Sequence, residues 1–144
     1  MANWIFSHYR SLHRHFFQDV YDWAGEKRAI RTGKGDNWFC YPEFIESEAE
    51  KLFRELASRG YLAGIEDKDA FAEEVAWFLA ELNAIHPFRE GNGRIQLVFL
   101  TMLARNAGYE LDEDRLRPKP FLDAMIVSFG GNLAPLTVEI RRML

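Results

Sequence analysis

Two runs of apolar residues with helical spacing, separated by a short break, constrain the fold more than any other feature of the sequence. The first run is Phe71, Val75, Phe78, Leu79, Leu82 and Ile85, and the second is Ile95, Val98, Phe99, Met102 and Leu103. Apolar residues that recur every three or four positions are typical of a helix that faces a core. Asp67 or Asp69 is expected to cap the first helix. The second helix is apolar over much of its circumference, which places it at the centre of a helical bundle.

The rest of the chain largely continues the helical pattern. Helices are predicted over residues 4–23, from Pro42 to Gly60, and near residues 119–129 and 134–143. The first of these would bury an apolar stripe that consists of Ile5, Leu12, Phe16, Val20 and Trp23. The second would bury Phe44, Ile45, Ala49, Leu52, Phe53 and Leu56. Proline followed by an acidic residue is typical of a helix start, and Gly25 would end the first helix.

Residues 28–40 differ from this pattern. Glycines are frequent there, and Gly35-Asp36-Asn37 has the composition of a tight turn between two short β-prone runs. The segment therefore predicts a β-hairpin, and at least one of the rings of Trp38 and Phe39 is expected to pack on the body of the protein. The predicted fold class is all-α: a compact helical bundle with one small β-hairpin.

The length of the chain predicts a single domain over residues 1–144. Its hydrophobic content of 48% is that of a globular protein and argues against disorder. Excision of this domain from a longer protein, such as a secreted effector or a toxin, stays open, because the chain begins and ends close to the predicted elements.

Nothing in the sequence predicts a membrane segment or a secretion signal. No apolar run approaches the roughly 20 residues that a membrane helix needs, and residues 1–4 lack the pattern of a signal peptide. Cys40 is the only cysteine, so no disulfide can form within the chain, which suits a reducing cytosol. A cytoplasmic location is expected, or delivery into a host cytoplasm if the domain is part of a secreted effector.

Charge and histidine positions disfavour two further classes of function. Residues 42–74 hold ten acidic and four basic residues, and such a segment would repel a nucleic acid. His8 and His15 could share one face of the first helix, with His13 pointing elsewhere. A metal site at these histidines is disfavoured, because no carboxylate or cysteine joins them at ligand spacing. They are expected to be hydrogen-bonded or solvated.

The break between the two long helices is His86-Pro87-Phe88-Arg89-Glu90-Gly91-Asn92-Gly93-Arg94. Gly91 and Gly93 allow close approach of a ligand to the backbone, and Asn92 tolerates a left-handed conformation. Because this turn opens a helix, its N–H groups and the helix dipole favour an anion, most often a phosphate. Arg94 adds a planar fork suited to phosphate oxygens. The ring of Phe88 is expected to anchor the loop in the core.

Two other side chains of this stretch suggest a reaction. A single carboxylate, Glu90, is a poor cage for most metals but suits Mg²⁺, which takes its remaining ligands from water and substrate phosphates. His86 is the residue type that can take a proton from a hydroxyl at neutral pH. Together these features suggest attack by a hydroxyl group on a magnesium-bound phosphate. Each feature alone is a weak signal.

The combination resembles a known family. His-Pro-Phe-x-Glu-Gly-Asn-Gly-Arg is the signature of the Fic family, and residues 86–94 match it at every fixed position. Residues 17–28 resemble the first conserved block of that family, residues 31–43 its hairpin "flap" and residues 107–111 the end of its post-motif helix. The resemblance covers the chain from about His8 to the C-terminus.

What the resemblance implies is AMP transfer: a Ser, Thr or Tyr hydroxyl of a target protein attacks the α-phosphate of ATP, and pyrophosphate leaves. His86 would be the general base, and Glu90 would bind the Mg²⁺ that bridges the α- and β-phosphates. Gly91, Asn92 and Gly93 would form the anion hole, and Arg94 would hold the β-phosphate side.

The resemblance also implies a docking site for the target. The flap would pair with a target segment by strand addition and place its hydroxyl over His86. The flap residues are Lys34, Gly35, Asp36, Asn37, Trp38, Phe39, Cys40 and Tyr41. Residues 35–38 are expected to make the contacts that select the target, because a charge and a large ring at a hairpin tip can discriminate between partners.

Leu97 departs from the family pattern. Many relatives carry there a second arginine, which grips the γ-phosphate and receives an inhibitory glutamate. A weaker contact with the γ-phosphate is therefore expected. The inhibitory helix, with Ser or Thr followed four residues later by Glu, has no match in the sequence. Regulation by a small, separate inhibitory protein stays open.

Other functions remain as alternatives. Transfer of UMP, phosphocholine or phosphate occurs in relatives with altered motifs, whereas Glu90 and the intact Gly-Asn-Gly turn favour AMP. The third alternative is a non-catalytic module that only docks a partner through its hairpin. The presence of both His86 and Glu90 argues against it.

Overall fold

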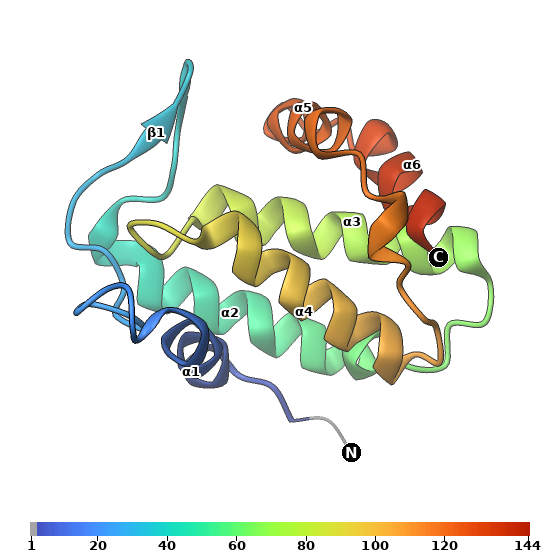
Figure 1. Ribbon diagram of the computed structural model, residues 1–144, viewed down its shortest axis with the longest axis horizontal. Coiled ribbons are helices and arrows are strands. Elements are labelled where there is room, and N and C mark those ends of the chain that lie inside the picture. Colours follow the sequence, from blue (N-terminus) through green and yellow to red (C-terminus); the bar gives the residue numbers. More distant parts are fainter. Residues whose placement is uncertain (1–2) are drawn as a thin grey trace.

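A bundle of α-helices with one short hairpin makes up the part of the chain that the computed structural model describes, residues 3–144 (Figure 1). The helices are α1 (Phe6–Phe17), α2 (Ile45–Ser58), α3 (Lys68–Ile85), α4 (Asn92–Asn106), α5 (Pro118–Ser128) and α6 (Ala134–Met143). The strands are β1 (Gly33–Lys34) and β2 (Asn37–Trp38). Short 3-10 turns lie at Pro42–Phe44, Gly60–Leu62 and Glu113–Arg115. The predicted all-α class with one small hairpin is confirmed.

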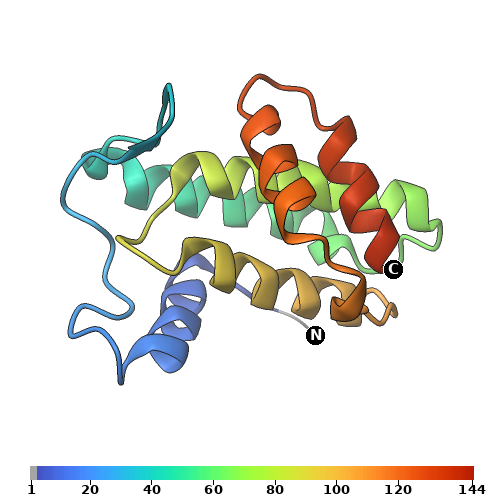
Figure 2. The same cartoon turned by 45° about the horizontal axis from the view of Figure 1, so that its top comes forward.

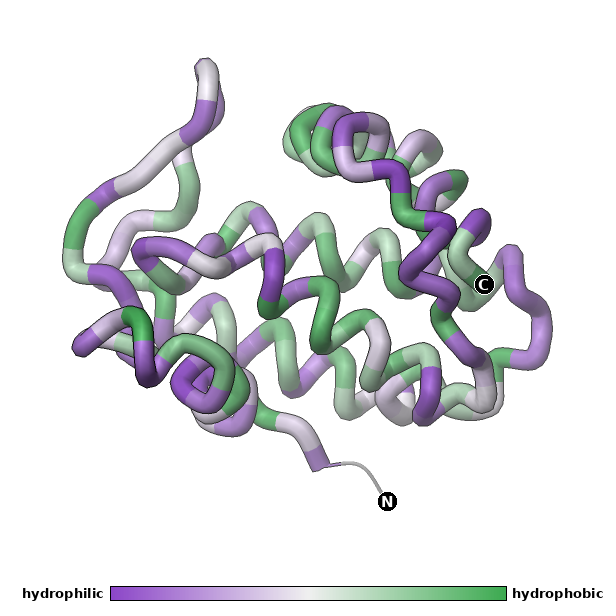
Figure 3. The backbone as a smooth tube through the Cα atoms, in the orientation of Figure 1, coloured by the Kyte–Doolittle hydropathy of each residue, from purple (hydrophilic) through white to green (hydrophobic). Residues whose placement is uncertain are grey.

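The core is centred on Phe99 of α4. This ring is fully buried, and its centroid lies 5.6 Å from those of Tyr9 on α1 and Phe53 on α2 and 5.5 Å from that of Phe78 on α3. Three other helices therefore meet α4, as its apolar circumference predicted, and Figure 2 shows α4 running beside α3. Green apolar segments recur along α2, α3 and α4 in Figure 3, which is the expected pattern for helices that share one core.

The predicted first helix is wrong in both its length and its buried face. It ends at Phe17, and the turns that follow reach Gly25, where the prediction placed its end. Of the predicted stripe, three residues are exposed: Ile5, Phe16 and Val20. The buried face is instead Phe6, Tyr9, His13 and Phe17. This set has helical spacing too, but it includes a histidine, which a search for apolar residues leaves out.

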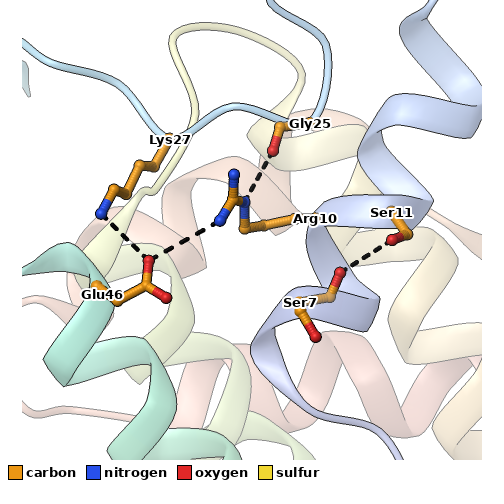
Figure 4. Close-up of polar contacts among 6 residues, drawn as sticks. All are labelled: Ser7, Arg10, Ser11, Gly25, Lys27 and Glu46. Carbon is orange, nitrogen blue, oxygen red and sulfur yellow. Dashed lines mark hydrogen bonds and ion pairs between the residues drawn. The ribbon is translucent and has the colours of Figure 1, made fainter.

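Polar contacts tie the segment after α1 to the bundle. Arg10 Nε donates a hydrogen bond of 2.9 Å to the carbonyl of Gly25, and Glu46 on α2 accepts one of 3.2 Å from Lys27 Nζ (Figure 4). The Glu46 carboxylate also lies 3.9 Å from the Arg10 guanidinium. These contacts fix the segment against both α1 and α2, immediately before the chain reaches Arg28.

The starts of α2 and α3 follow the predictions. Asp67 caps α3 by accepting a hydrogen bond from the N–H of Asp69, and Pro42 opens the turn that leads into α2. Phe44, however, was expected in the buried stripe of that helix and is exposed, because it precedes the helix proper.

Among residues 3–144, no helix is both long and apolar enough to span a bilayer.

The hairpin is shorter than predicted and stands away from the helices (Figure 1). Its strands pair antiparallel, with Gly33 opposite Trp38 and Lys34 opposite Asn37, and Gly35 takes the positive φ of 61° that the turn needs. Trp38 is 65% exposed, whereas Phe39 is only 5% exposed. The expectation that at least one of the two rings packs on the body is confirmed by Phe39.

Candidate active site

His86 lies where α3 stops. Its backbone is left-handed, with φ 49° and ψ 65°, and its N–H still donates to the carbonyl of Leu82 at 2.9 Å. Pro87 explains the stop, because a residue that precedes proline disfavours the α-helical conformation. The His86 ring stacks on the ring of Phe39, with 3.6 Å between centroids and 2° between planes. The base proposed from the sequence is thus covered by a flap side chain.

The surroundings of His86 keep its imidazole neutral. Burial lowers its pKa to about 4, and the nearby charges of Arg28 and Lys34 act in the same direction. The backbone carbonyl of Asn83 opposes these effects in part. Nδ1 is buried and makes no hydrogen bond within normal geometry, which leaves Nε2 as the nitrogen that can meet a hydroxyl. A neutral imidazole is the form that accepts a proton.

Arg28 connects the base of the hairpin with the end of α3. Its guanidinium is 2% exposed and donates to four backbone carbonyls, those of His86 at 2.7 Å, Ile30 at 2.7 Å, Cys40 at 2.5 Å and Ile85 at 3.0 Å. Its own N–H donates to the carbonyl of Pro87 at 2.8 Å. Burial lowers the pKa of Arg28. No role was predicted for Arg28, although it lies in the first block that resembles the Fic family.

The motif loop is closed by the side chain of Asn92. Its Oδ1 accepts from the N–H of Phe88 at 3.0 Å, and its Nδ2 donates to the carbonyl of Phe88 at 2.7 Å. Both residues are buried, so the expected anchoring role of Phe88 is confirmed. Because the amide of Asn92 is used inside the loop, only its backbone N–H is left for a ligand.

The first turn of α4 is open to an anion. Gly91 has a φ of 82°, no side chain caps the helix, and no acidic residue stands in its first turn. A Cβ on Gly93 would meet nothing within 4 Å, so the space above this residue is free. Glu90 and Arg94 are both exposed on either side of the turn. These are the features of a phosphate-binding helix N-terminus.

Two hollows meet at His86. One, of about 340 Å³, lies between the hairpin and α5 and has a mainly apolar lining that includes Leu97, Phe121 and Ile126. The other, of about 400 Å³, is more polar and is lined by the motif loop, with Glu90 and Gly91 among its residues. His86, Gly93, Lys34 and Phe39 line both. A volume of this size is typical of a small-molecule site.

The predicted site residues divide between this cleft and its surroundings. Of the motif, His86 and residues 89–94 line one or both hollows, whereas Pro87 and Phe88 are buried and line neither. Of the flap, Lys34, Asn37 and Phe39 face the cleft. Cys40 and Tyr41 line a separate groove beside α2 and α3, so the structure does not bring these two to the cleft.

The metal chemistry of the site has to rest on one carboxylate. Within residues 3–144, no group of three or more His, Cys, Asp or Glu side chains could hold a metal ion. An exposed carboxylate beside an open helix N-terminus nevertheless fits Mg²⁺, which takes water and phosphate oxygens as its other ligands. His13 is buried and hydrogen-bonded, as expected, whereas His8 Nε2 is buried and has no hydrogen-bond partner among residues 3–144, which contradicts the expectation for that residue.

Comparison with known protein families gives one match. The model of the Fic/DOC family matches residues 5–104. This range includes helices α1 to α4, apart from the last two residues of α4.

Three curated relatives carry names that agree with this match. The chain is 73% identical to the probable protein adenylyltransferase y4lH of Sinorhizobium fredii, over 96% of the chain and 72% of that protein. It is 39% identical to the protein adenylyltransferase VbhT of Bartonella schoenbuchensis, over 95% of the chain but 28% of that protein. For the probable protein adenylyltransferase Fic of Escherichia coli the identity is 43%, over 90% of the chain and 64% of that protein.

Solved structures agree in fold. The N-terminal Fic domain of a VirB-translocated Bep effector from Bartonella quintana, with bound ADP, superposes with a TM-score of 0.87 at 25% identity, over 96% of this chain and 72% of that one. BepC of Bartonella tribocorum, solved with bound AMPPNP, gives a TM-score of 0.86 at 24% identity, over 96% and 73%. At such identities the likeness to BepC concerns the fold alone.

Proposed function

Because this chain belongs to the Fic/DOC family, we propose that it is a protein adenylyltransferase, which moves AMP from ATP to a Ser, Thr or Tyr hydroxyl of a target protein and releases pyrophosphate. The observation that carries this proposal is the position of His86, a neutral imidazole at the junction of two hollows and beside the open N-terminus of α4. The names of the 73%, 43% and 39% identical relatives support it.

The nucleotide is proposed to bind along the start of α4. The backbone N–H groups of Gly91, Asn92 and Gly93 would hold phosphate oxygens, and Arg94 would hold the β-phosphate side. The mainly apolar hollow next to Gly93 and Arg94 is large enough for the nucleoside, and the rings of Phe121 and Phe129 lie in its lining. Leu97 also lines this hollow, so no second arginine is available there for the γ-phosphate.

The transfer step is proposed to use His86 as general base. Nε2 takes the proton of the incoming hydroxyl while the hydroxyl oxygen forms a bond to the α-phosphorus. The bond from that phosphorus to the oxygen bridging to the β-phosphate breaks, and pyrophosphate leaves. Mg²⁺ held by Glu90 would supply neutralisation of the charge on the phosphate oxygens. The N–H groups at the start of α4 are fixed before the reaction, so they need no reorganisation to stabilise this charge.

The target is proposed to dock on the hairpin, residues 34–41. The two strands are only two residues long each. The hairpin that they form stands away from the helices, and both of its backbone edges lie there. An extended target segment could add to such an edge through backbone hydrogen bonds. Lys34 and Phe39 of the same hairpin face the cleft. A target segment bound to this hairpin would therefore bring its own Ser, Thr or Tyr hydroxyl toward His86.

A separate inhibitory protein is proposed because the chain shows no inhibitory helix of its own. The glutamate of that inhibitory protein would have to bind elsewhere than at Leu97.

Action in the cytoplasm of the producing cell is proposed, or in a host cell if the chain belongs to a secreted effector. The type IV secretion effector BepA supports the second location, with a TM-score of 0.84 at 26% identity over 96% of this chain and 52% of that one.

One labelling experiment tests the proposed reaction. The protein is incubated with a cell lysate and ATP labelled on either the α- or the γ-phosphate, and protein-bound label is measured. Label from the α-phosphate alone supports AMP transfer, and label from the γ-phosphate alone would indicate a kinase. Parallel reactions with UTP and CDP-choline test the other transfers. No label from any donor would leave only a docking module, and His86→Ala serves as the inactive control.

A further inference from the structure

His13 is a buried ring that the proposed reaction does not use. It lies on α1 with no exposed surface, stacked on Phe88 with 3.8 Å between ring centroids and 4.7 Å from the ring of Phe17. Burial lowers its pKa, which favours the neutral ring. A polar group in such a position is stable only when its nitrogen atoms have hydrogen-bond partners.

Both nitrogens of His13 have partners, and both partners are backbone atoms. The N–H of Gly25 donates to Nδ1 at 2.9 Å, so Nε2 must carry the ring proton. Nε2 lies 2.9 Å from the carbonyl oxygen of Glu90, to which it can therefore donate. The imidazole thus bridges the segment after α1 and the motif loop at the residue that carries the proposed metal ligand.

The Gly25 side of this bridge is rigid. Arg10 Nε holds the carbonyl of Gly25 at 2.9 Å, as Figure 4 shows. Gly25 also has a φ of 83°, and a Cβ there would lie 2.8 Å from the Cβ of Arg14. The backbone at Gly25 is therefore seated directly on α1, and it presents a fixed N–H donor to His13 Nδ1.

The motif loop is seated just as closely on the other side. A Cβ on Gly91 would lie 2.7 Å from Phe17 Cε2 and 3.2 Å from His13 Nε2. The Glu90 side chain, in contrast, is exposed and makes no hydrogen bond or ion pair among residues 3–144. What the protein holds of Glu90 is its main chain, and His13 is the side chain that holds it.

We infer that His13 is a positioning residue, which fixes the Glu90 main chain and so directs the Glu90 carboxylate toward the nucleotide phosphates. This inference rests on the proposed function, in which Glu90 binds Mg²⁺. Groups that orient a metal ligand typically contribute about 10- to 100-fold in metal affinity. A side chain that only fills the core would contribute to stability and not to this affinity.

Three substitutions separate the two hydrogen bonds from packing. His13→Gln can place an amide N–H near the position of Nε2 and keep the contact with Glu90. His13→Asn can place an oxygen near Nδ1 for Gly25 but is too short for Glu90. His13→Phe keeps an aromatic ring on Phe88 and loses both bonds. His15→Gln and His15→Phe are matched controls on an exposed histidine of the same helix.

The measurement is the affinity for AMPPNP by calorimetry, once with Mg²⁺ and once with EDTA, on variants whose melting curves confirm folding. The increase in affinity on adding Mg²⁺ is expected to fall about 10- to 100-fold in His13→Asn and His13→Phe, and to be retained within about threefold in His13→Gln and both His15 variants. Retention in all three His13 variants would overturn the inference, and so would a loss in His13→Gln as large as in His13→Asn.

The same experiment keeps the two proposals apart. The wild-type protein alone tests the role of Glu90: if Mg²⁺ does not increase its affinity for AMPPNP, the metal site and the inference both fail. If the wild-type increase is present and survives in the His13 variants, only the role of His13 fails. Equal losses with Mg²⁺ and with EDTA would show a general loosening of the loop and would also overturn the positioning role.

Discussion

The rings of Phe39 and His86 lie parallel, 3.6 Å apart between centroids and 2° apart in orientation. One belongs to the hairpin proposed to dock the target, and the other is the proposed base. Phe39 also lies beside Phe129, the residue that follows α5, with 5.5 Å between ring centroids. Phe39, the residue that follows β2, therefore covers one face of the imidazole and removes water from it.

Removing this cover is expected to change the pH dependence of the reaction. Burial lowers the pKa of His86 to about 4, so the wild-type imidazole stays neutral as the pH falls until it nears that value. In Phe39→Ala, water reaches the ring and the pKa should rise toward its ordinary value of 6.5. The acid limb of the kcat/KM profile should then move to higher pH. An unchanged limb, with the ring pKa also unchanged by NMR titration, would contradict a shielding role of Phe39.

Replacement of Arg28, even by lysine, should lower the stability of the protein. Its planar fork serves four carbonyls from the hairpin base and the end of α3, and a lysine ammonium cannot reach all of them. Each buried carbonyl left without a partner costs about 1–3 kcal/mol, so Arg28→Lys should lower the free energy of unfolding by roughly 3 kcal/mol or more. Urea unfolding measures this change. Arg105→Lys, at an exposed arginine of α4, should change it by less than about 0.5 kcal/mol.

The two glycines of the motif turn should respond differently to alanine. Gly91 has a φ of 82° and a Cβ there would meet Phe17 at 2.7 Å, so Gly91→Ala should cost roughly 1–3 kcal/mol of stability. Gly93 has free space above it, so Gly93→Ala should melt like the wild type and yet bind AMPPNP more weakly, because the methyl group would enter the proposed phosphate site. Equal binding by wild type and Gly93→Ala would place the phosphates elsewhere.

Asp36 should affect the choice of target and not the reaction itself. It is exposed at the hairpin tip, between Gly35 and Asn37. Asp36→Lys should change which lysate proteins receive AMP while self-modification continues at the wild-type rate. Gel patterns from α-labelled ATP measure both quantities. Equal loss of self-modification and of target labelling would assign Asp36 to the catalytic machinery instead.

Leu97→Arg should increase the preference for ATP over ADP. Leu97 lines the mainly apolar hollow one turn beyond Arg94, and a guanidinium placed there would meet a terminal phosphate. We expect the ratio of the two affinities, measured by calorimetry, to rise about tenfold, which corresponds to roughly 1.4 kcal/mol. Leu97→Met is the size-matched control. A ratio that does not change would place the γ-phosphate away from this helix face.

The sequence was most informative where local pattern and chemistry coincide. The apolar repeat of α3 and α4 predicts both helices and the central position of α4, and the fixed positions of the motif predict the loop that joins them. Trp38 and Phe39 illustrate the limit of such reasoning. The pattern predicts that one ring packs, but which one depends on how the hairpin meets His86.

Arg28 and His13 could not be found in this way. Both are polar side chains in the core, and their partners are backbone atoms far along the chain, such as the carbonyls of His86 and Glu90. No local spacing reports such a partner. A histidine on a buried helix face was also the reason why the stripe of α1 was assigned to the wrong residues.

Arg28 donates hydrogen bonds to four carbonyls and so links the base of the hairpin directly to His86. A polypeptide that bent the hairpin on docking would also displace His86, the proposed proton acceptor, because a single guanidinium holds both. Poorly fitting polypeptides would therefore misalign the chemistry at the moment of docking. Fidelity toward the correct polypeptide would then arise before any phosphate bond is broken.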